Sequence, residues 1–169
     1  IIVTEIEHAA TINTAKQLAD SGFDVVFLAP DETGHITPEG LSEALTEDTI
    51  LLSCQLVNNE IGTVQPVEQL GKLLKAKAPK ALFHIDAVQG LCRVRLTPKK
   101  WNCDLMSVSG HKIGAPKGIG ALYVKKGLRL PPLTFGGGQE RGMRPGTEAV
   151  PNIAAFAKAC EIRMAHFEE

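Results

Sequence analysis

The sequence has 169 residues, of which 44% are hydrophobic and 22% are charged, and its formal net charge is −1. This size and composition fit one globular domain with a single core. The near-neutral charge argues against a broad nucleic-acid-binding surface, and no apolar run reaches the roughly 18 residues of a membrane-spanning helix. We therefore expect neither direct nucleic-acid binding nor membrane association.

The predicted elements alternate between strands and helices. In chain order they are a strand at 1–4, a helix at 9–21, a strand at 25–28, a helix beginning at Thr37-Pro38, a strand at 49–57, a helix at 66–76, strands at 81–85, 105–108 and 120–124, a loop at 128–146 and a helix at 150–167. This alternation predicts βαβ units, and the apolar strands predict burial on both faces. The predicted fold is α/β with three layers, a mainly parallel sheet with helices on both faces.

Local signals set several boundaries. Gly22 is placed to end the helix at 9–21. Thr37 is a suitable N-cap residue for the next helix, and Pro38 suits its first helical position. The loop at 128–146 is too long for a simple connection, so we expect it to be functional or to lie at a subunit contact. The chain begins in a strand-like segment without Met and ends inside a helical pattern, so we expect a segment of a longer protein.

The four cysteines are Cys54, Cys92, Cys103 and Cys160, and none forms a CxxC pair. We interpret them as reduced, mostly buried thiols of a cytoplasmic protein. Structural zinc requires paired Cys or His ligands at short spacing, which this sequence lacks. No metal site is predicted.

Polar residues follow four of the predicted strands. His8 follows the first strand, Asn58-Asn59 follow the long one, Asp86 ends the next, and His111-Lys112 follow another. Ligands of open α/β sheets bind beyond the carboxyl ends of the strands. We therefore predict that these residues meet in one site.

Lys112 lies in the segment Ser109-Gly110-His111-Lys112. A lysine that bonds covalently to a carbonyl cofactor needs a partly desolvated amine with a lowered pKa, whereas the alternative is an ordinary surface lysine. Ser109 and His111 carry hydrogen-bond donors suited to a phosphate.

Asp86 and Gln89 lie in one short segment after an apolar strand. Pyridoxal phosphate (PLP) acts as an electron sink when a carboxylate keeps its pyridine nitrogen protonated, and Asp86 is a candidate for that role. Gln89 could then reach the phenolic oxygen of the cofactor. The alternatives are a helix N-cap for Asp86 and a polar loop residue for Gln89.

Three further features admit a functional and an ordinary interpretation. The His8 imidazole could stack on a cofactor ring or move protons, or it could simply start a helix. Asn59 could bond a substrate carboxylate or the cofactor, or belong to an Asn-rich turn. The Gly-rich, basic segment 136–147 could present backbone N–H groups to an anion, or be a flexible surface loop. It does not match a dinucleotide fingerprint.

Taken together, six segments closely resemble the cysteine desulfurases and the related selenocysteine lyases of the class V aminotransferase group, which are fold-type I PLP enzymes. The segments are 4–8 (TEIEH), 57–62 (VNNEIG), 84–89 (HIDAVQ), 107–112 (SVSGHK), 116–124 (PKGIGALYV) and 136–147 (GGGQERGMRPGT). Each motif alone is modest, but all six occur in the family's order and cover essentially the whole chain.

The resemblance implies a role for each candidate residue. Lys112 would carry the PLP cofactor and later move protons, and His8 would stack on the ring and assist protonation. The remaining roles are Asp86 at the pyridine nitrogen, Gln89 at the phenolic oxygen, Ser109 and His111 at the phosphate, Asn59 at the substrate or cofactor, and Thr147 at the phosphate of the neighbouring subunit's cofactor in a homodimer.

The implied reaction converts L-cysteine to L-alanine and leaves the sulfur as a persulfide on an enzyme cysteine. The sulfur would then pass to an iron–sulfur scaffold or a tRNA-modifying partner. In the family, a Gly-Ala-Thr phosphate loop would precede this chain, and the substrate-binding Arg and the sulfur-accepting Cys would follow Glu169. We therefore expect residues 1–169 to be part of the PLP-binding large domain, inactive alone, and we assign none of the four cysteines as the nucleophile.

The sequence departs from the family after the lysine, because residues 111–116 lack the usual bulky residue and the Gly before Pro116. This change could alter the turn but should not remove the covalent role of Lys112. Three alternatives remain open at this point: a selenocysteine lyase, another class V enzyme such as an aminotransferase, and a non-catalytic truncated module.

Overall fold

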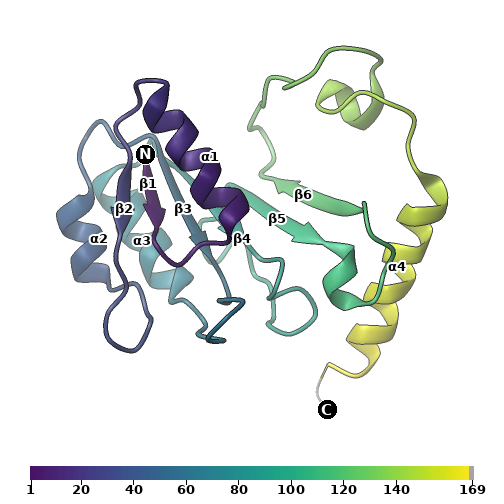
Figure 1. The fold of residues 1–169 in the computed structure, drawn as a ribbon, viewed down its shortest axis with the longest axis horizontal. Coiled ribbons are helices and arrows are strands. Elements are labelled where there is room, and N and C mark those ends of the chain that lie inside the picture. Colours follow the sequence, from purple (N-terminus) through teal and green to yellow (C-terminus); the bar gives the residue numbers. More distant parts are fainter. Residues whose placement is uncertain (168–169) are drawn as a thin grey trace.

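The computed structural model describes residues 1–167 and contains one six-stranded sheet with the strand order β2-β1-β3-β4-β5-β6. Five strands run parallel to their neighbours, and β6 pairs antiparallel with β5. The strands are β1 (Ile2–Thr4), β2 (Val26–Leu28), β3 (Leu51–Gln55), β4 (Leu82–Asp86), β5 (Leu105–Ser109) and β6 (Gly120–Val124). The predicted α/β fold with a mainly parallel sheet is confirmed (Figure 1).

Four α-helices accompany the sheet in the described part of the chain, together with two 3₁₀ helices. They are α1 (Ala9–Asp20), α2 (Pro38–Ala44), α3 (Val67–Lys77) and α4 (Val150–Ala165), with η1 (Gly110–Ile113) and η2 (Gln139–Gly142). The expected caps are present: the Thr37 hydroxyl accepts a hydrogen bond from the Gly40 N–H at 3.0 Å, and Gly22 follows α1 with φ of +94°. Figure 1 shows α1 on one face of the sheet and α3 behind it, so helices cover both faces.

The hydrophobic core lies on the face of the sheet that α2 and α3 cover. Side chains such as Leu52, Phe83 and Ile85 are fully buried there against Leu70 and Leu74 of α3. Full burial of one such side chain stabilises the fold by about 1.5–3 kcal/mol. Alternate residues of the same strands therefore point to the opposite face, where the candidate site lies.

Helix α3 approaches the chain around Trp101 closely. A Cβ atom placed on Gly71 would lie 2.0 Å from the Trp101 carbonyl oxygen and 3.2 Å from Phe83 Cδ1. Only glycine fits this contact without a shift of the backbone.

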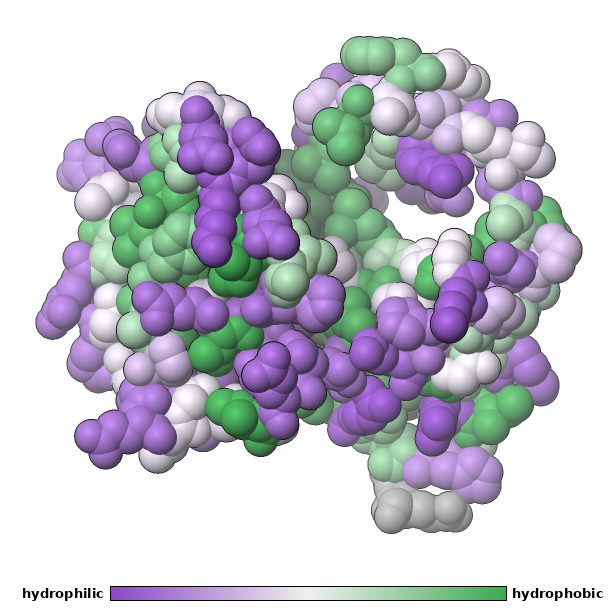
Figure 2. Space-filling model, viewed as in Figure 1, coloured by the Kyte–Doolittle hydropathy of each residue, from purple (hydrophilic) through white to green (hydrophobic). Residues whose placement is uncertain are grey.

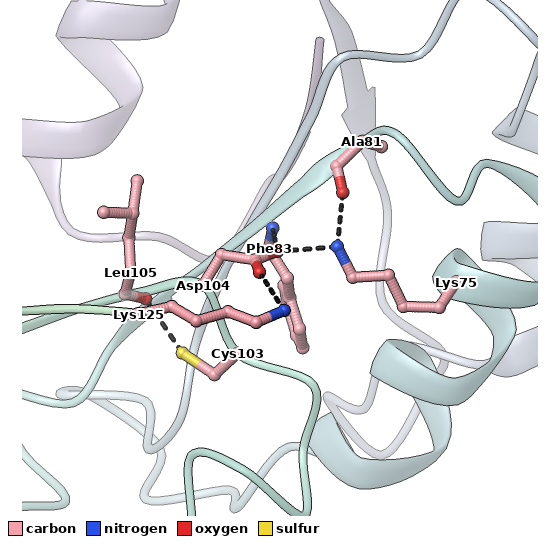
Figure 3. Close-up of polar contacts among 7 residues, drawn as sticks. All are labelled: Lys75, Ala81, Phe83, Cys103, Asp104, Leu105 and Lys125. Carbon is pink, nitrogen blue, oxygen red and sulfur yellow. Dashed lines mark hydrogen bonds and ion pairs between the residues drawn. The ribbon is translucent and has the colours of Figure 1, made fainter. Parts of the chain in front are cut away.

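A buried carboxylate joins three elements at the end of the sheet opposite to the candidate site (Figure 3). Asp104 accepts hydrogen bonds from Lys75 Nζ of α3 at 2.6 Å, from Lys125 Nζ after β6 at 2.9 Å and from the Phe83 backbone N–H at 3.0 Å. Burial alone would raise the pKa of Asp104, but these donors together lower it. The carboxylate is therefore held charged between two lysines.

Three expectations differ from the structure. Strand β3 ends at Gln55 because Val57 instead forms an isolated bridge with Val64. Burial on both faces is found in β1 and in most of β3, but not in every strand: β4 alternates, with His84 and Asp86 on the less buried side, and residues 120–122 of β6 are exposed. The loop at 128–146 contains η2. Within residues 1–167, no helix has the length and apolar character that crossing a membrane requires.

Candidate functional site

A cavity of about 640 Å³ opens on the face of the sheet opposite to the core, beside α1. Its wall includes seven of the eight residues that the sequence singled out: His8, Asn59, Asp86, Gln89, Ser109, His111 and Lys112. Figure 2 shows this side of the molecule hollowed between the part that carries α1 and the C-terminal part, with hydrophobic residues in the hollow. The predicted convergence of strand ends is thus present, and the volume suits a small organic ligand.

Asp86 and Gln89 lie at the end of β4. One carboxylate oxygen of Asp86, Oδ1, accepts a hydrogen bond from the Val88 N–H at 2.9 Å, so Asp86 does cap the following turn. Gln89 Oε1 accepts from Arg93 Nη1 at 3.2 Å. Asp86 therefore keeps a second oxygen as an acceptor, and Gln89 keeps its amide N–H groups as donors.

The 3₁₀ helix η1 carries His111 and Lys112 directly after β5. Gly110 is the first residue of η1, and a side chain would not fit there, because a Cβ would lie 2.9 Å from Ile119 and 3.1 Å from Phe156. Gly114 ends η1 with φ of +95°. The Ala115 N–H donates to the Gly110 carbonyl at 3.0 Å, so the turn is complete despite the departure from the family pattern.

Two contacts fix the side chains and backbone of this segment. Ser109 Oγ and His111 Nδ1 lie 2.7 Å apart and share a hydrogen bond. The Lys112 carbonyl accepts a hydrogen bond from Arg93 Nη2 at 3.0 Å. Arg93 therefore connects the segment of Gln89 with that of Lys112.

His8 is both a helix cap and a cavity residue. Its Nδ1 accepts a hydrogen bond from the Ala10 N–H at 3.1 Å, at the start of α1. In the neutral imidazole the proton is consequently on Nε2. The helix-start interpretation is correct, and it leaves the Nε2–H group for a ligand.

Asn58 forms the turn that the sequence analysis attributed to Asn59. Asn58 Oδ1 accepts from the N–H groups of Glu60 and Ile61, and Asn58 Nδ2 donates to the Ile6 carbonyl at 2.9 Å. Asn59 is exposed and lines the cavity. Asn58 thus ties the segment after β3 to the segment that carries His8.

A polar row crosses three strands beneath the cavity. His84 bonds through Nδ1 to Ser53 Oγ at 2.8 Å and through Nε2 to Ser107 Oγ at 2.9 Å. Burial lowers the pKa of His84, although the charge of Asp86 opposes this. Sequence reasoning gave His84 no role, because a single histidine in an apolar strand carries no distinctive signal.

Glu7 is a second residue that sequence reasoning missed. Its buried Oε1 accepts hydrogen bonds from the Thr4 hydroxyl at 2.6 Å and from the Gln55 N–H. Burial raises the pKa of Glu7 to about 7, partly offset by these hydrogen bonds. Glu7 Oε2 and the side-chain nitrogen of Gln55 are buried without a hydrogen-bond partner among residues 1–167. The only sequence signal was an acidic residue just after a buried strand.

Thr147 does not line the cavity. It lies exposed at the end of the segment 136–147, between η2 and α4. No group of three or more His, Cys, Asp or Glu side chains within residues 1–167 is placed to hold a metal ion.

The chain is similar to known proteins over essentially its whole length, both in sequence and in structure. A family model described as aminotransferase class-V matches residues 1–168. Cysteine desulfurase 2 of Trichormus variabilis is 49% identical over 169 residues, which is 100% of this chain and 42% of that protein.

Two solved structures show the same fold. A NifS-like protein superposes with a TM-score of 0.95 at 42% identity, covering 99% of this chain and 46% of that one. SspA in complex with cysteine gives a TM-score of 0.90 at 42% identity over 95% of this chain and 46% of that one. The chain therefore spans less than half the length of these relatives.

Proposed function

Because this chain belongs to the aminotransferase class-V family, we propose that the protein containing it is a PLP-dependent cysteine desulfurase that converts L-cysteine to L-alanine. The carrying observation is that seven residues chosen from the sequence line one cavity at the carboxyl ends of the strands. A relative at 49% identity bears the name cysteine desulfurase, and a solved structure with the same fold holds cysteine.

The residues of the cavity fit PLP by their chemistry. The cavity offers a carboxylate at Asp86, amide donors at Gln89, a hydroxyl and an imidazole at Ser109 and His111, and an amine at Lys112. The unpartnered amide nitrogen of Gln55, in the same wall, is a further buried donor that a bound group would satisfy. When bound, PLP would supply an electron sink for bonds broken at the substrate.

Each of these residues then has a defined task. Asp86 would hold a proton on the pyridine nitrogen through its uncapped oxygen, and Gln89 would donate to the phenolic oxygen. Lys112 Nζ would bind the cofactor covalently and move a proton at the substrate. His8 would cover the ring and donate through Nε2, since its Nδ1 is engaged by Ala10.

The remaining binding roles belong to the anionic groups and the second subunit. Ser109 and His111, already paired, would hold the phosphate, and Asn59 would hold the substrate or the cofactor. Thr147, which is exposed and not part of the cavity wall, would reach the phosphate of a neighbouring subunit's cofactor in a homodimer. In this proposal residues 1–169 belong to the PLP-binding large domain.

The sulfur would leave as a persulfide on an enzyme cysteine and pass to an acceptor protein, such as an iron–sulfur scaffold or a tRNA-modifying enzyme. Cys54 and Cys103 do not suit this task, because burial raises the pKa of both thiols, that of Cys103 to about 12. The family resemblance places the sulfur-accepting cysteine after Glu169, and the burial of Cys54 and Cys103 is consistent with that placement.

The cofactor site is tested by absorption spectroscopy of the full-length protein with added PLP. We expect a yellow band that sodium borohydride removes, with the reduced cofactor attached to the peptide of Lys112. Lys112→Ala should lack the band, whereas Lys117→Ala, at an exposed lysine outside the cavity, should keep it. A band of equal strength in Lys112→Ala would refute the assignment of the lysine.

The reaction is tested by alanine release from L-cysteine, and by sulfide release when a thiol reductant such as dithiothreitol is added to reduce the persulfide. Faster turnover of L-selenocysteine would favour a selenocysteine lyase, and turnover that requires an added oxo-acid would favour an aminotransferase. PLP binding without any of these activities would leave a non-catalytic module as the better description.

A further inference from the structure

Arg93 lies outside the cavity wall but contacts two residues that belong to it. Its Nη1 donates to the Gln89 carbonyl at 3.0 Å and to Gln89 Oε1 at 3.2 Å. Its Nη2 donates to the Lys112 carbonyl at 3.0 Å. One guanidinium group therefore makes three hydrogen bonds to the segments that follow β4 and β5. The roles proposed above do not include Arg93.

The chemistry of arginine decides which end of the Gln89 amide faces the cavity. A glutamine amide has an acceptor oxygen at one end and a donor nitrogen at the other. An arginine side chain only donates hydrogen bonds, so Arg93 bonds the amide oxygen and not the amide nitrogen. With Oε1 held by Arg93, the Nε2 end of Gln89 is left to donate within the cavity that this residue lines.

The second contact of Arg93 relates Gln89 to Lys112. The guanidinium fork is planar and rigid, so it holds the Gln89 side chain and the Lys112 backbone near a fixed spacing. In PLP, the phenolic oxygen and the aldehyde that a lysine amine attacks are carried by neighbouring ring carbons. Arg93 thus links the two residues that the proposed function assigns to these neighbouring positions.

We propose that Arg93 is a positioning residue for the cofactor, which turns the Gln89 amide so that Nε2, and not Oε1, faces the phenolic oxygen of PLP. The inference rests on the proposed function, because it requires PLP in this cavity. A donor at the phenolic oxygen stabilises the negative charge of that oxygen after the bound cofactor loses its proton. Arg93 would therefore lower the pH at which the chromophore loses this proton.

The test follows the absorption spectrum of the full-length protein, loaded with PLP, as the pH is raised. The spectrum changes at a midpoint pH as the chromophore loses its proton. In Arg93→Met the amide is no longer held, and the midpoint should rise by about 1 pH unit, the size expected for one hydrogen bond to a charged group. Arg93→Lys keeps a cation that only donates, so its midpoint should stay closer to that of the wild type. Arg93→Glu would accept from Nε2 and turn Oε1 toward the cavity, so it should raise the midpoint further.

Two controls separate the orientation of the amide from a general loss of charge. Arg95→Met removes an exposed positive charge two residues away and should leave the midpoint unchanged. A Gln89→Leu protein has no amide to orient, so adding Arg93→Met to it should cause little further change. The titratable side chains of the cavity wall stay the same in every variant, and they are His8, His84, Asp86, His111 and Lys112.

Arg93 is exposed, so these substitutions should leave the far-ultraviolet circular dichroism of the protein unchanged. Equal midpoints in the wild type and Arg93→Met would overturn the inference, as would a lowered midpoint in Arg93→Glu. An undiminished rise when Arg93→Met is added to Gln89→Leu would also overturn it. A wild-type protein that forms no yellow band with PLP would instead refute the proposed function, and this inference with it.

Discussion

The Glu7 carboxylate accepts a buried hydrogen bond from the Gln55 backbone N–H. Glu7 lies just after β1, and Gln55 is the last residue of β3. This contact fixes the segment that carries His8 to the end of β3, the strand that pairs with β4. It also keeps a carboxyl group out of water close to the candidate site, where Asp86 adds to the rise of its pKa.

Glu7 should therefore make the stability of the chain depend on pH. Its pKa is about 7 in the folded protein and 4.5 ordinarily, so the unfolded chain ionises first as the pH rises. The contribution of Glu7 to stability is fully present below pH 4.5 and is lost, by up to about 3 kcal/mol, as the pH rises from 4.5 to 7. Glu7→Gln should remove this dependence, so that its unfolding free energy relative to wild type rises between pH 5 and pH 8.

Urea denaturation at several pH values measures this difference. Glu5→Gln, at an exposed carboxyl two positions away, is the control and should show no such change. A constant difference between Glu7→Gln and wild type across the range would show that Glu7 does not titrate in this way.

The two roles of His8 can be separated by substitution. Asn is a good N-cap residue, so the free energy of unfolding of His8→Asn should lie within about 0.5 kcal/mol of that of the wild type. That of His8→Ala should be lower by about 1 kcal/mol. Both variants lose the imidazole, and we expect desulfuration by the full-length protein to fall by about 10²-fold or more in each. Full activity in His8→Asn would reduce His8 to a helix cap.

Gly71→Ala should be destabilising although alanine favours helices. The new Cβ would lie 2.0 Å from the Trp101 carbonyl oxygen, and moving α3 away should cost about 1–3 kcal/mol. Gly138→Ala is the matched control, because its Cβ meets nothing within 4 Å and its φ is −85°. Denaturation midpoints that do not differ between the two variants would contradict this packing.

Asp104→Asn should cost more than a comparable change at the surface. Asp104 is buried between Lys75 and Lys125, so neutralising it should destabilise the fold by about 2–3 kcal/mol. Glu68 also pairs with two lysines but is only partly buried, and Glu68→Gln should have a much smaller effect. The lowered pKa of Asp104 means that its contribution is lost only as the pH falls below 3.8.

Sequence patterns located the site because the ends of parallel strands converge by topology. Residues at the ends of β1, β3, β4 and β5 can be chosen without knowing which way their side chains point. His8, Asp86 and Lys112 were therefore predicted in advance. Asn59 was also chosen in advance and lines the cavity, but the structural role of Asn58 was missed, because it depends on the turn of its amide toward Ile6.

Other features depend on contacts that no local pattern encodes. Glu7 resembles a surface residue until Gln55, far along the chain, is placed against it. His84 interrupts a strand that otherwise seems apolar, and its partners Ser53 and Ser107 come from two other strands. The role of Thr147 requires a second subunit, so it stays a prediction, as does the cytoplasmic location.

The two faces of the sheet divide its residues by the kind of change they tolerate. Leu52 and Phe83 point into the core, while Ser53 and His84, their neighbours in sequence, lie on the face of the cavity. A substitution at one position of a strand therefore tests packing, and a substitution at the next tests chemistry. Selection for a new substrate could act on alternate residues of β3, β4 and β5 while the intervening residues preserve the fold.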